Sequence, residues 1–245
     1  MKTETPNKII AVLISVDYSD LLRLALPFNS KIFDDIYVAT TKEDRECIDI
    51  CSNYNNVHAF ILDDSVFYKN GAIFNKGAAY NALFEDLTAK QFNEWICVCD
   101  SDIIFPPNLK DLAINLIPNK MYSLPRSFCK NEEQYKNYLD HIKKGGSHSS
   151  GAWGSPKSAV GAGYMQLFKF NSSIRMPENF KDAGKIDHKF RTLYFGGHGQ
   201  NNGENCPRLS PRPEYGLNDV EYCVHLGPRA TNWRGRKSER WYLDD

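Results

Sequence analysis

The sequence predicts an α/β fold in which a mostly parallel sheet lies between two layers of helices. Short runs rich in Ile, Val and Leu alternate, over the first hundred residues, with segments whose apolar residues recur at helical spacing. Residues 9–16 form a continuous apolar run, which is typical of a parallel strand buried on both faces. Strands that alternate with helices predict a three-layer α/β/α sandwich.

The individual elements follow from these patterns and from the residues that end them. Asp17 follows the first strand, Asp20 is placed to cap the first helix, and this helix is expected to stop near Pro27. We expect strands at residues 9–16, 36–39, 58–62, 95–98, 121–124 and 164–170. We expect helices at residues 20–26, 42–52, 74–87 and 132–144, and a further one that begins at Asp187.

The composition narrows the class of protein. The chain has 245 residues, 42% of them apolar, and its 30 basic residues balance its 30 acidic ones. A protein whose whole surface binds nucleic acid would be more basic. The run at residues 9–16 is too short for a secretion signal or a membrane span, so we expect a cytoplasmic protein. Seven cysteines without paired zinc spacing favour a reducing compartment.

Two carboxylates follow the predicted strand at residues 95–98. Asp100 and Asp102 stand two residues apart where this strand ends. In open α/β sheets, ligands bind at the carboxyl ends of the strands. Carboxylate oxygens suit Mg²⁺ or Mn²⁺, which in turn binds a diphosphate. The alternative is a polar strand-to-loop transition in which both side chains are solvated.

The surrounding sequence resembles the GT-A glycosyltransferases, in particular family-2-like and galactosyltransferase-like members. The resemblance rests on the strand, the Asp-x-Asp pair, the Pro-Pro-Asn-Leu that follows it at residues 106–109, and the run Phe-Asn-Lys-Gly-Ala-Ala-Tyr-Asn at residues 74–81. It covers residues 8–110 well and the remainder loosely. It implies a GT-A-type fold with a Rossmann-like sheet and an irregular C-terminal acceptor half. One domain over residues 1–245 is expected, with the nucleotide-sugar-binding half at about 8–110.

The resemblance also implies where the donor binds. Asp17 and Tyr18, in the loop after the first strand, would contact the base and ribose, although an ordinary helix-capping turn explains them as well. The helix at residues 74–87 would lie near the donor, with contacts from Asn75, Lys76 and Asn81. The family often has an acidic pair after its second strand. This chain has two threonines there, and the acids at 63 and 64 are a possible substitute.

The C-terminal segment adds a metal ligand and basic residues by the same resemblance. His225 follows a short apolar run, as does the late histidine that completes the metal site in many GT-A enzymes. Arg229, Arg234 and Arg236 would bind the diphosphate through their planar guanidinium groups. A solvated basic tail and a contact with a polyanionic acceptor are the alternatives.

A carboxylate must accept the proton of the acceptor hydroxyl if sugar transfer inverts configuration. Asp187 matches the position of this base, and Asp219 and Glu221 are the fallback candidates. Gly161 and Gly163 would allow close approach of the backbone to the donor and acceptor sugars, and Trp153 would close over the donor.

The resulting hypothesis is a metal-dependent glycosyltransferase that uses a nucleoside-diphosphate sugar, with UDP favoured by family habit. The acceptor would be a hydroxyl of a glycan, a protein or a modified nucleic acid. A nucleotidyltransferase is the first alternative, but the loop after the first strand lacks the Gly-rich, basic pattern that cradles a triphosphate. A non-catalytic nucleotide- or glycan-binding protein of the same fold is the second.

Overall fold

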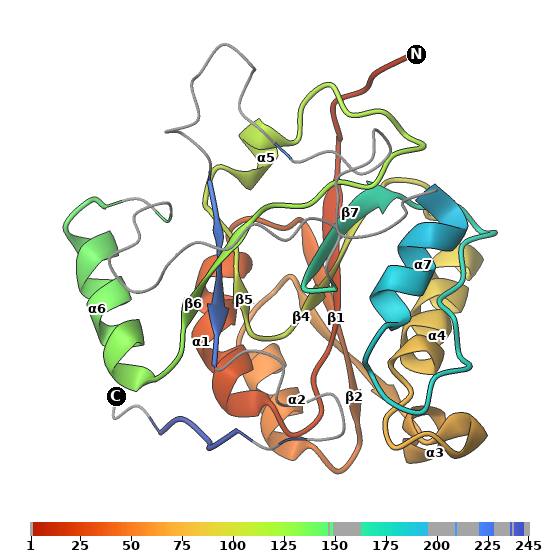
Figure 1. Ribbon diagram of the computed structural model, residues 1–245, viewed down its shortest axis with the longest axis horizontal. Coiled ribbons are helices and arrows are strands. Elements are labelled where there is room, and N and C mark those ends of the chain that lie inside the picture. Colours follow the sequence, from red (N-terminus) through yellow and green to blue (C-terminus); the bar gives the residue numbers. More distant parts are fainter. Residues whose placement is uncertain are drawn as a thin grey trace.

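The computed structural model describes residues 2–146, 148, 163–195, 209, 221–227, 236 and 238–242. A five-stranded sheet in the order β3-β2-β1-β4-β7 runs through its middle (Figure 1). The first four of these strands are parallel and β7 pairs with β4 in the antiparallel direction. The strands are β1 (Ile9–Ile14), β2 (Asp35–Thr41), β3 (Val57–Leu62), β4 (Trp95–Asp100) and β7 (Met165–Lys169). The predicted mostly parallel sheet is confirmed.

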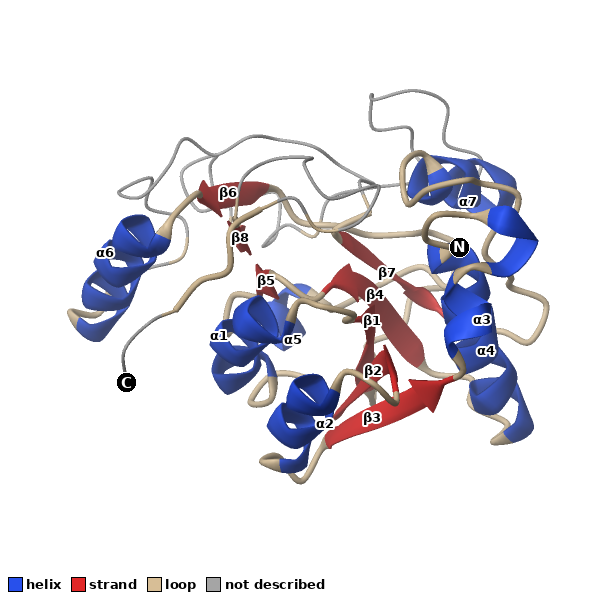
Figure 2. Cartoon of the chain, turned by 90° about the horizontal axis from the view of Figure 1, so that it is seen from below, coloured by secondary structure: helices blue, strands red, loops and turns tan. Residues whose placement is uncertain are grey.

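Helices cover both faces of this sheet (Figure 2). One face carries α1 and α2, and the other carries α3, α4 and α7. Side-chain caps fix where several of them begin: Asp44 accepts a hydrogen bond from the third residue of α2, and Asn75 and Asn131 do the same for α4 and α6. The bounds are α1 (Ser19–Asn29), α2 (Arg45–Ser52), α3 (Asp64–Phe67), η1 (Lys69–Gly71), α4 (Lys76–Ala89), α5 (Leu109–Leu112), α6 (Glu132–Lys143) and α7 (Ile186–Phe195).

The core lies in two layers because the side chains of β1 alternate between the faces of the sheet. Ile9, Ala11 and Leu13 belong to the cluster that includes residues of α1 and α2. Ile10 and Val12 belong to the cluster that includes residues of α4 and α7. All six residues of β1 are buried, as the continuous apolar run predicts. Each fully buried Leu or Ile side chain contributes about 1.5–3 kcal/mol, so this strand anchors both layers.

A second, three-stranded sheet packs beside α1. Its order is β5-β8-β6, with β5 (Ile103–Ile104) antiparallel to β8 (Cys223–Leu226) and β6 (Arg126–Cys129) parallel to it. The strand order places β8, which comes last in the sequence, between two strands from the middle of the chain. Because β5 directly follows β4, β8 brings the C-terminal part of the chain next to the end of β4.

Two sequence expectations about elements are wrong. The strand expected at residues 121–124 contains only bridge residues, of which Tyr122 exchanges two main-chain hydrogen bonds with Leu167, and the strand begins after Pro125. Asp20 does not cap the first helix, which begins at Ser19 with Tyr18 as its N-cap. This helix ends at Asn29, close to Pro27 as expected.

The cysteines of the described part of the chain are free and buried, at positions 47, 51, 97, 99, 129 and 223. Among the described residues, no helix has both the length and the apolar character needed to cross a membrane.

Candidate active site

Asp100 and Asp102 lie at the carboxyl end of β4, in the centre of the sheet. Asp100 is the last residue of β4 and stands in register with Ile14, the last residue of β1. The chain then turns through Ser101 and Asp102 into β5. The first five residues of β4 are buried, which fixes the direction in which this turn leaves the sheet. Both carboxylates are therefore held at the edge where α/β proteins bind ligands.

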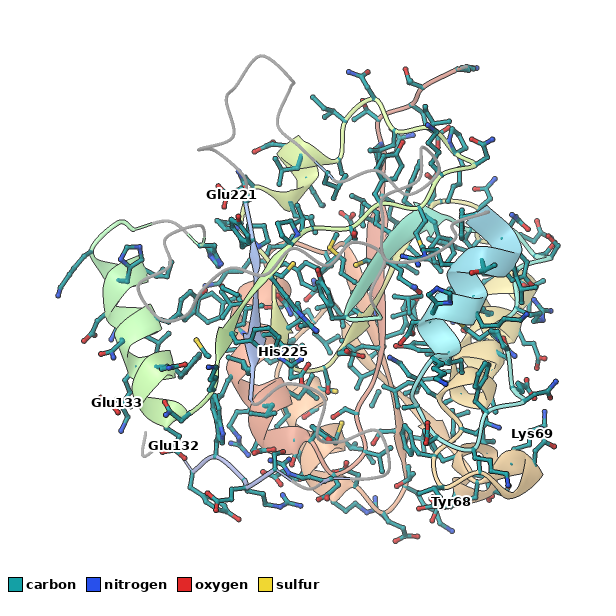
Figure 3. The ribbon with its side chains drawn as sticks, in the orientation of Figure 1. Tyr68, Lys69, Glu132, Glu133, Glu221 and His225 are labelled. Atoms are coloured by element: carbon teal, nitrogen blue, oxygen red, sulfur yellow. The ribbon has the colours of Figure 1, made fainter. Side chains whose placement is uncertain are left out.

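His225 reaches these carboxylates through β8. It pairs with Ile103 of β5, the residue directly after Asp102, and the Asp102 carbonyl accepts a hydrogen bond from Leu226 N at 2.8 Å. His225 Nε2 lies 3.5 Å from Asp102 Oδ2. Figure 3 shows His225 toward the middle of the molecule on the β8 ribbon. The ligand atoms of Asp100, Asp102 and His225 all lie within 4.8 Å of one another.

The chemistry of this Asp–Asp–His cluster fits a divalent cation. Asp102 Oδ1 and His225 Nδ1 are buried, and neither has a hydrogen-bond partner among the described residues. Burial, together with the charge of Asp100, raises the pKa of Asp102 to about 8. Burial, reinforced by the Arg126 cation, lowers the pKa of His225 to about 3, so the imidazole is neutral and able to bind a metal. A cation would satisfy both unpaired atoms and the excess negative charge.

Lys76 joins the first carboxylate to Asp187. Its Nζ lies 2.7 Å from Asp100 Oδ1 and 3.6 Å from Asp187 Oδ1, and its side chain is only 10% exposed. Burial alone would lower the pKa of Lys76, but the carboxylates of Asp100 and Asp187 outweigh it and the pKa is raised. Lys76 is the first residue of α4 and Asp187 the second residue of α7. The starts of these two helices thus meet beside the end of β4.

Glycines allow this close packing. A Cβ at Gly163 would overlap the Asp187 carboxylate, and a Cβ at Gly77 would overlap the carbonyl group of Pro177. Gly77 is therefore the small residue that lets α4 pack against residues 174–178. Gly163 is the one residue of the expected Gly-rich turn that the structure describes, because Gly161 lies outside the described residues.

Asp187 is largely buried, and two features of its environment act on its pKa in opposite directions. Burial raises its pKa, and the positive charge of Lys76 opposes the rise. Among the described residues, Asp187 Oδ1 has no hydrogen-bond partner. Glu221, a fallback candidate for the base, instead accepts a hydrogen bond from Asn108 Nδ2 at 3.4 Å. Asp219, the other fallback candidate, lies outside the described residues.

The loop after β1 brings Tyr18 to the same place. Burial raises the pKa of Tyr18, and the charges of Asp102 and Asp100 raise it further. Asp17 is exposed and has a φ of 64°, and its main-chain N–H donates to Asp44 Oδ2 at 2.9 Å. Its carboxylate pairs with Arg240. The base and ribose contacts expected from Asp17 and Tyr18 stay predictions.

Arg236 is engaged within the protein. Its guanidinium group pairs with both oxygens of Asp20, at 2.6 and 2.7 Å, and it stacks over the Tyr18 ring at 4.9 Å. Both side chains of the pair are 6% exposed. A phosphate would have to compete with Asp20 for this arginine. Arg229 and Arg234 lie outside the described residues, as does Trp153.

Asn75 and Asn81 hold α4 in place. Asn75 caps the helix and its Nδ2 donates to the carbonyls of Lys69 and Glu178. Asn81 donates to the Met176 carbonyl at 2.9 Å and accepts from Met176 N at 2.7 Å. These contacts are structural, and they fix the position of Lys76 at the start of the helix. Asp63, considered as a substitute acid, caps α3 through Ser65 N.

Sequence reasoning missed Arg126. It is the first residue of β6, and its guanidinium carbon lies 4.1 Å from the ring centre of Tyr164 and 4.8 Å from that of Phe128. Phe128 in turn contacts the His225 ring, with 4.9 Å between the ring centres. A single arginine after Pro125 matches no motif, and the strand that carries it was expected at residues 121–124. The sequence therefore contained no signal that would have selected it.

Comparisons with known proteins support the fold. No protein-family model matches the chain, and no curated protein sequence matches it. Among solved structures it is similar to S. aureus TarS, with a TM-score of 0.52 and 14% sequence identity over 89% of this chain. The fold is a glycosyltransferase-like Rossmann-type fold. The match covers 36% of the TarS chain, so the protein spans just over a third of that neighbour's length.

A second similar structure is 4-diphosphocytidyl-2C-methyl-D-erythritolsynthase from Anaerococcus prevotii DSM 20548. Its TM-score is 0.40 and its identity 11%, over 91% of this chain and 88% of that one. A TM-score this low carries no argument about function.

Proposed function

We propose that the protein is a metal-dependent glycosyltransferase that moves a sugar from a UDP-sugar to an acceptor hydroxyl with inversion of configuration. The observation that carries the proposal is the cluster of Asp100, Asp102 and His225 at the carboxyl end of the central strand β4. The glycosyltransferase-like fold supports it. In this proposal the chain is one domain, with residues 8–110 as the donor half and residues 111–245 as the acceptor half.

Asp100, Asp102 and His225 would hold Mn²⁺ or Mg²⁺, which when bound would supply positive charge for binding the donor diphosphate. Two carboxylate oxygens and a neutral imidazole nitrogen form a ligand set intermediate between hard and soft, which favours Mn²⁺. Tyr18, whose pKa responds to the charges of both carboxylates, would contact the nucleotide from the side of the β1–α1 loop.

Asp187 would act as the general base that accepts the proton of the acceptor hydroxyl. Its pKa is raised by burial, which brings it closer to neutral pH, where a carboxylate is a more effective base. Lys76 holds Asp187 beside the metal-ligand cluster and stabilises its charged form. The hydroxyl oxygen would attack the anomeric carbon from the side opposite the diphosphate, which gives inversion. The acceptor class, a glycan, a protein or a modified nucleic acid, belongs to the same proposal.

The test is a calorimetric titration of UDP with and without Mn²⁺, on the wild-type protein, on Asp102→Asn and on Asp111→Asn. Asp111 is an exposed residue of α5, so its variant is a matched control for the loss of one carboxylate. We expect micromolar binding that needs Mn²⁺, that is lost in Asp102→Asn and that is retained in Asp111→Asn.

Metal-independent binding, or equal binding by Asp102→Asn, would refute the metal site. A screen of UDP-sugars for release of UDP then tests turnover. Release of pyrophosphate from a nucleoside triphosphate and a sugar phosphate would instead identify a nucleotidyltransferase, and binding without turnover of any donor and acceptor would identify a binding protein.

A further inference from the structure

Arg126 is an arginine whose charge no carboxylate of the described residues neutralises. Arg236 pairs with Asp20, Arg23 pairs with Glu46 and Arg240 pairs with Asp17, but no ion pair of Arg126 occurs within the part of the chain that the structure describes. Its partners there are two aromatic rings, Tyr164 at 4.1 Å and Phe128 at 4.8 Å. Within the described part of the chain, the cation is thus held by aromatic rings and not by an ion pair.

Aromatic contacts leave the hydrogen-bonding edge of a guanidinium group available. A guanidinium group stacks on rings through its flat faces, whereas its five N–H groups point outward in the plane. This planar edge matches two oxygens of a phosphate or a carboxylate. An arginine that is stacked in this way is therefore prepared to bind an anion from outside the protein.

The two rings that hold Arg126 connect it to the surroundings of the metal-ligand cluster and of the candidate base. Phe128 lies against the His225 ring. The carbonyl of Tyr164 accepts a hydrogen bond from Asp100 N at 3.3 Å, and Tyr164 follows Gly163, which packs directly on Asp187. The positive charge of Arg126 also acts on two of the three metal ligands, since it lowers the pKa of His225 and opposes the rise in the pKa of Asp102.

We propose that Arg126 binds the β-phosphate of the donor and stabilises it as the leaving group. This inference rests on the proposed glycosyltransferase function. In the transfer step the acceptor oxygen forms a bond to the anomeric carbon, and the bond between that carbon and the β-phosphate oxygen breaks. The electron pair stays on the diphosphate, and the acceptor proton moves to Asp187. Negative charge thus develops on the β-phosphate, where donors that are already in place stabilise the transition state.

The test compares the affinities of UDP and UMP, because only UDP carries the β-phosphate. Both nucleotides are titrated with Mn²⁺ into the wild type, Arg126→Met, Arg126→Lys and the control Arg175→Met. Arg175 follows β7 and donates to the main-chain carbonyls of Ser172 and Ile174, so its variant removes an arginine outside the proposed site. Methionine keeps an unbranched stem that can pack on the two rings.

We expect UDP affinity to fall about 10- to 100-fold in Arg126→Met, as for a lost hydrogen bond to a charged group, with UMP affinity unchanged. In Arg126→Lys we expect an intermediate loss of UDP affinity, because an ammonium group keeps the charge but lacks the planar hydrogen-bonding edge of the guanidinium group. Arg175→Met should match the wild type. Circular dichroism checks that each variant is folded. If Arg126→Met does not fold, the ratio of UDP to UMP affinity in Arg126→Lys tests the proposal instead.

The outcomes separate the two proposals. If the wild type does not bind UDP in the presence of Mn²⁺, the proposed function fails and the role of Arg126 fails with it. If the wild type binds UDP and the Arg126 variants show the same ratio of UDP to UMP affinity, the role of Arg126 is wrong while the proposed function stands.

Discussion

The contact between Gly163 and Asp187 allows a direct test of the proposed base. Replacing Gly163 by alanine adds one methyl group where the Asp187 carboxylate now lies. Even the more distant oxygen, Oδ1, would be 2.7 Å from the new Cβ, whereas ordinary contacts begin at 3.4 Å. The carboxylate must therefore move by at least about 0.7 Å, and by more at Oδ2 and Cγ, which would overlap the methyl group.

This displacement should slow the chemical step more than it weakens donor binding. A misplacement of about 1 Å in a reacting group costs on the order of 100-fold in rate. The three atoms nearest the added methyl group all belong to Asp187, and none belongs to the metal ligands Asp100, Asp102 and His225. We therefore expect kcat for UDP release with an acceptor present to fall about 100-fold in Gly163→Ala, with UDP and Mn²⁺ affinities within about threefold of wild type.

The assay is steady-state transfer measured by UDP release, with calorimetric UDP binding on the same samples as the control for the donor site. Asp187→Asn serves as the reference for a protein without the base. The kcat of Gly163→Ala should approach the kcat of Asp187→Asn. A Gly163→Ala protein with wild-type kcat would refute the assignment of Asp187 as the base. Loss of UDP binding together with activity would show instead that the methyl group disrupts the whole site.

Three further predictions concern the metal site and the packing around it. The pKa of Asp102 is raised to about 8 in the protein without metal, so at pH 7 this carboxyl carries a proton that Mn²⁺ must displace. The protonated form contributes folding stability that is lost as the pH rises toward 8. In the same range we expect the affinity for Mn²⁺ to rise by up to about tenfold per pH unit and then to level off. A Mn²⁺ affinity that calorimetry finds unchanged between pH 6 and 8 would contradict this. Gly77→Ala should lower the free energy of unfolding by about 1–3 kcal/mol, because the added Cβ would overlap the Pro177 carbonyl group, and a thermal melt unchanged from wild type would show that α4 shifts without cost. Arg236→Met should cost about 3–5 kcal/mol in urea unfolding, because it leaves the buried carboxylate of Asp20 without its cation and with only the hydrogen bond from Trp241 N. Adding Asp20→Asn should recover part of that loss; no recovery would mean that packing contributes more than charge.

The sequence predicted the central sheet well because its strands are strongly patterned. Residues 9–16 and 95–98 read as buried strands, and the structure has β1 and β4 there with every residue from Trp95 to Cys99 buried. The strand expected at residues 121–124 was wrong because its apolar residues are buried by tertiary contacts and not by a ladder. Local patterns do not distinguish these two causes of burial.

Only part of the candidate site could be predicted from the sequence. The sequence groups Asp100, Asp102 and His225 as metal ligands, and the structure brings their ligand atoms within 4.8 Å of one another, while metal binding itself stays a prediction. The bridge that Lys76 makes between Asp100 and Asp187 was not predicted, because it depends on how the starts of α4 and α7 meet. Arg126 was missed because its place depends on ring contacts with residues far away in the sequence.

The order of strands in the small sheet also has a consequence for how the protein is made. β5 and β6 do not pair with each other. Each pairs with β8, which is separated from β5 by more than a hundred residues. A growing chain that has just left the ribosome up to α7 already contains every strand of the large sheet. It still lacks His225, so synthesis of the last strand is the step at which the chain first gains all three members of its cation-binding cluster.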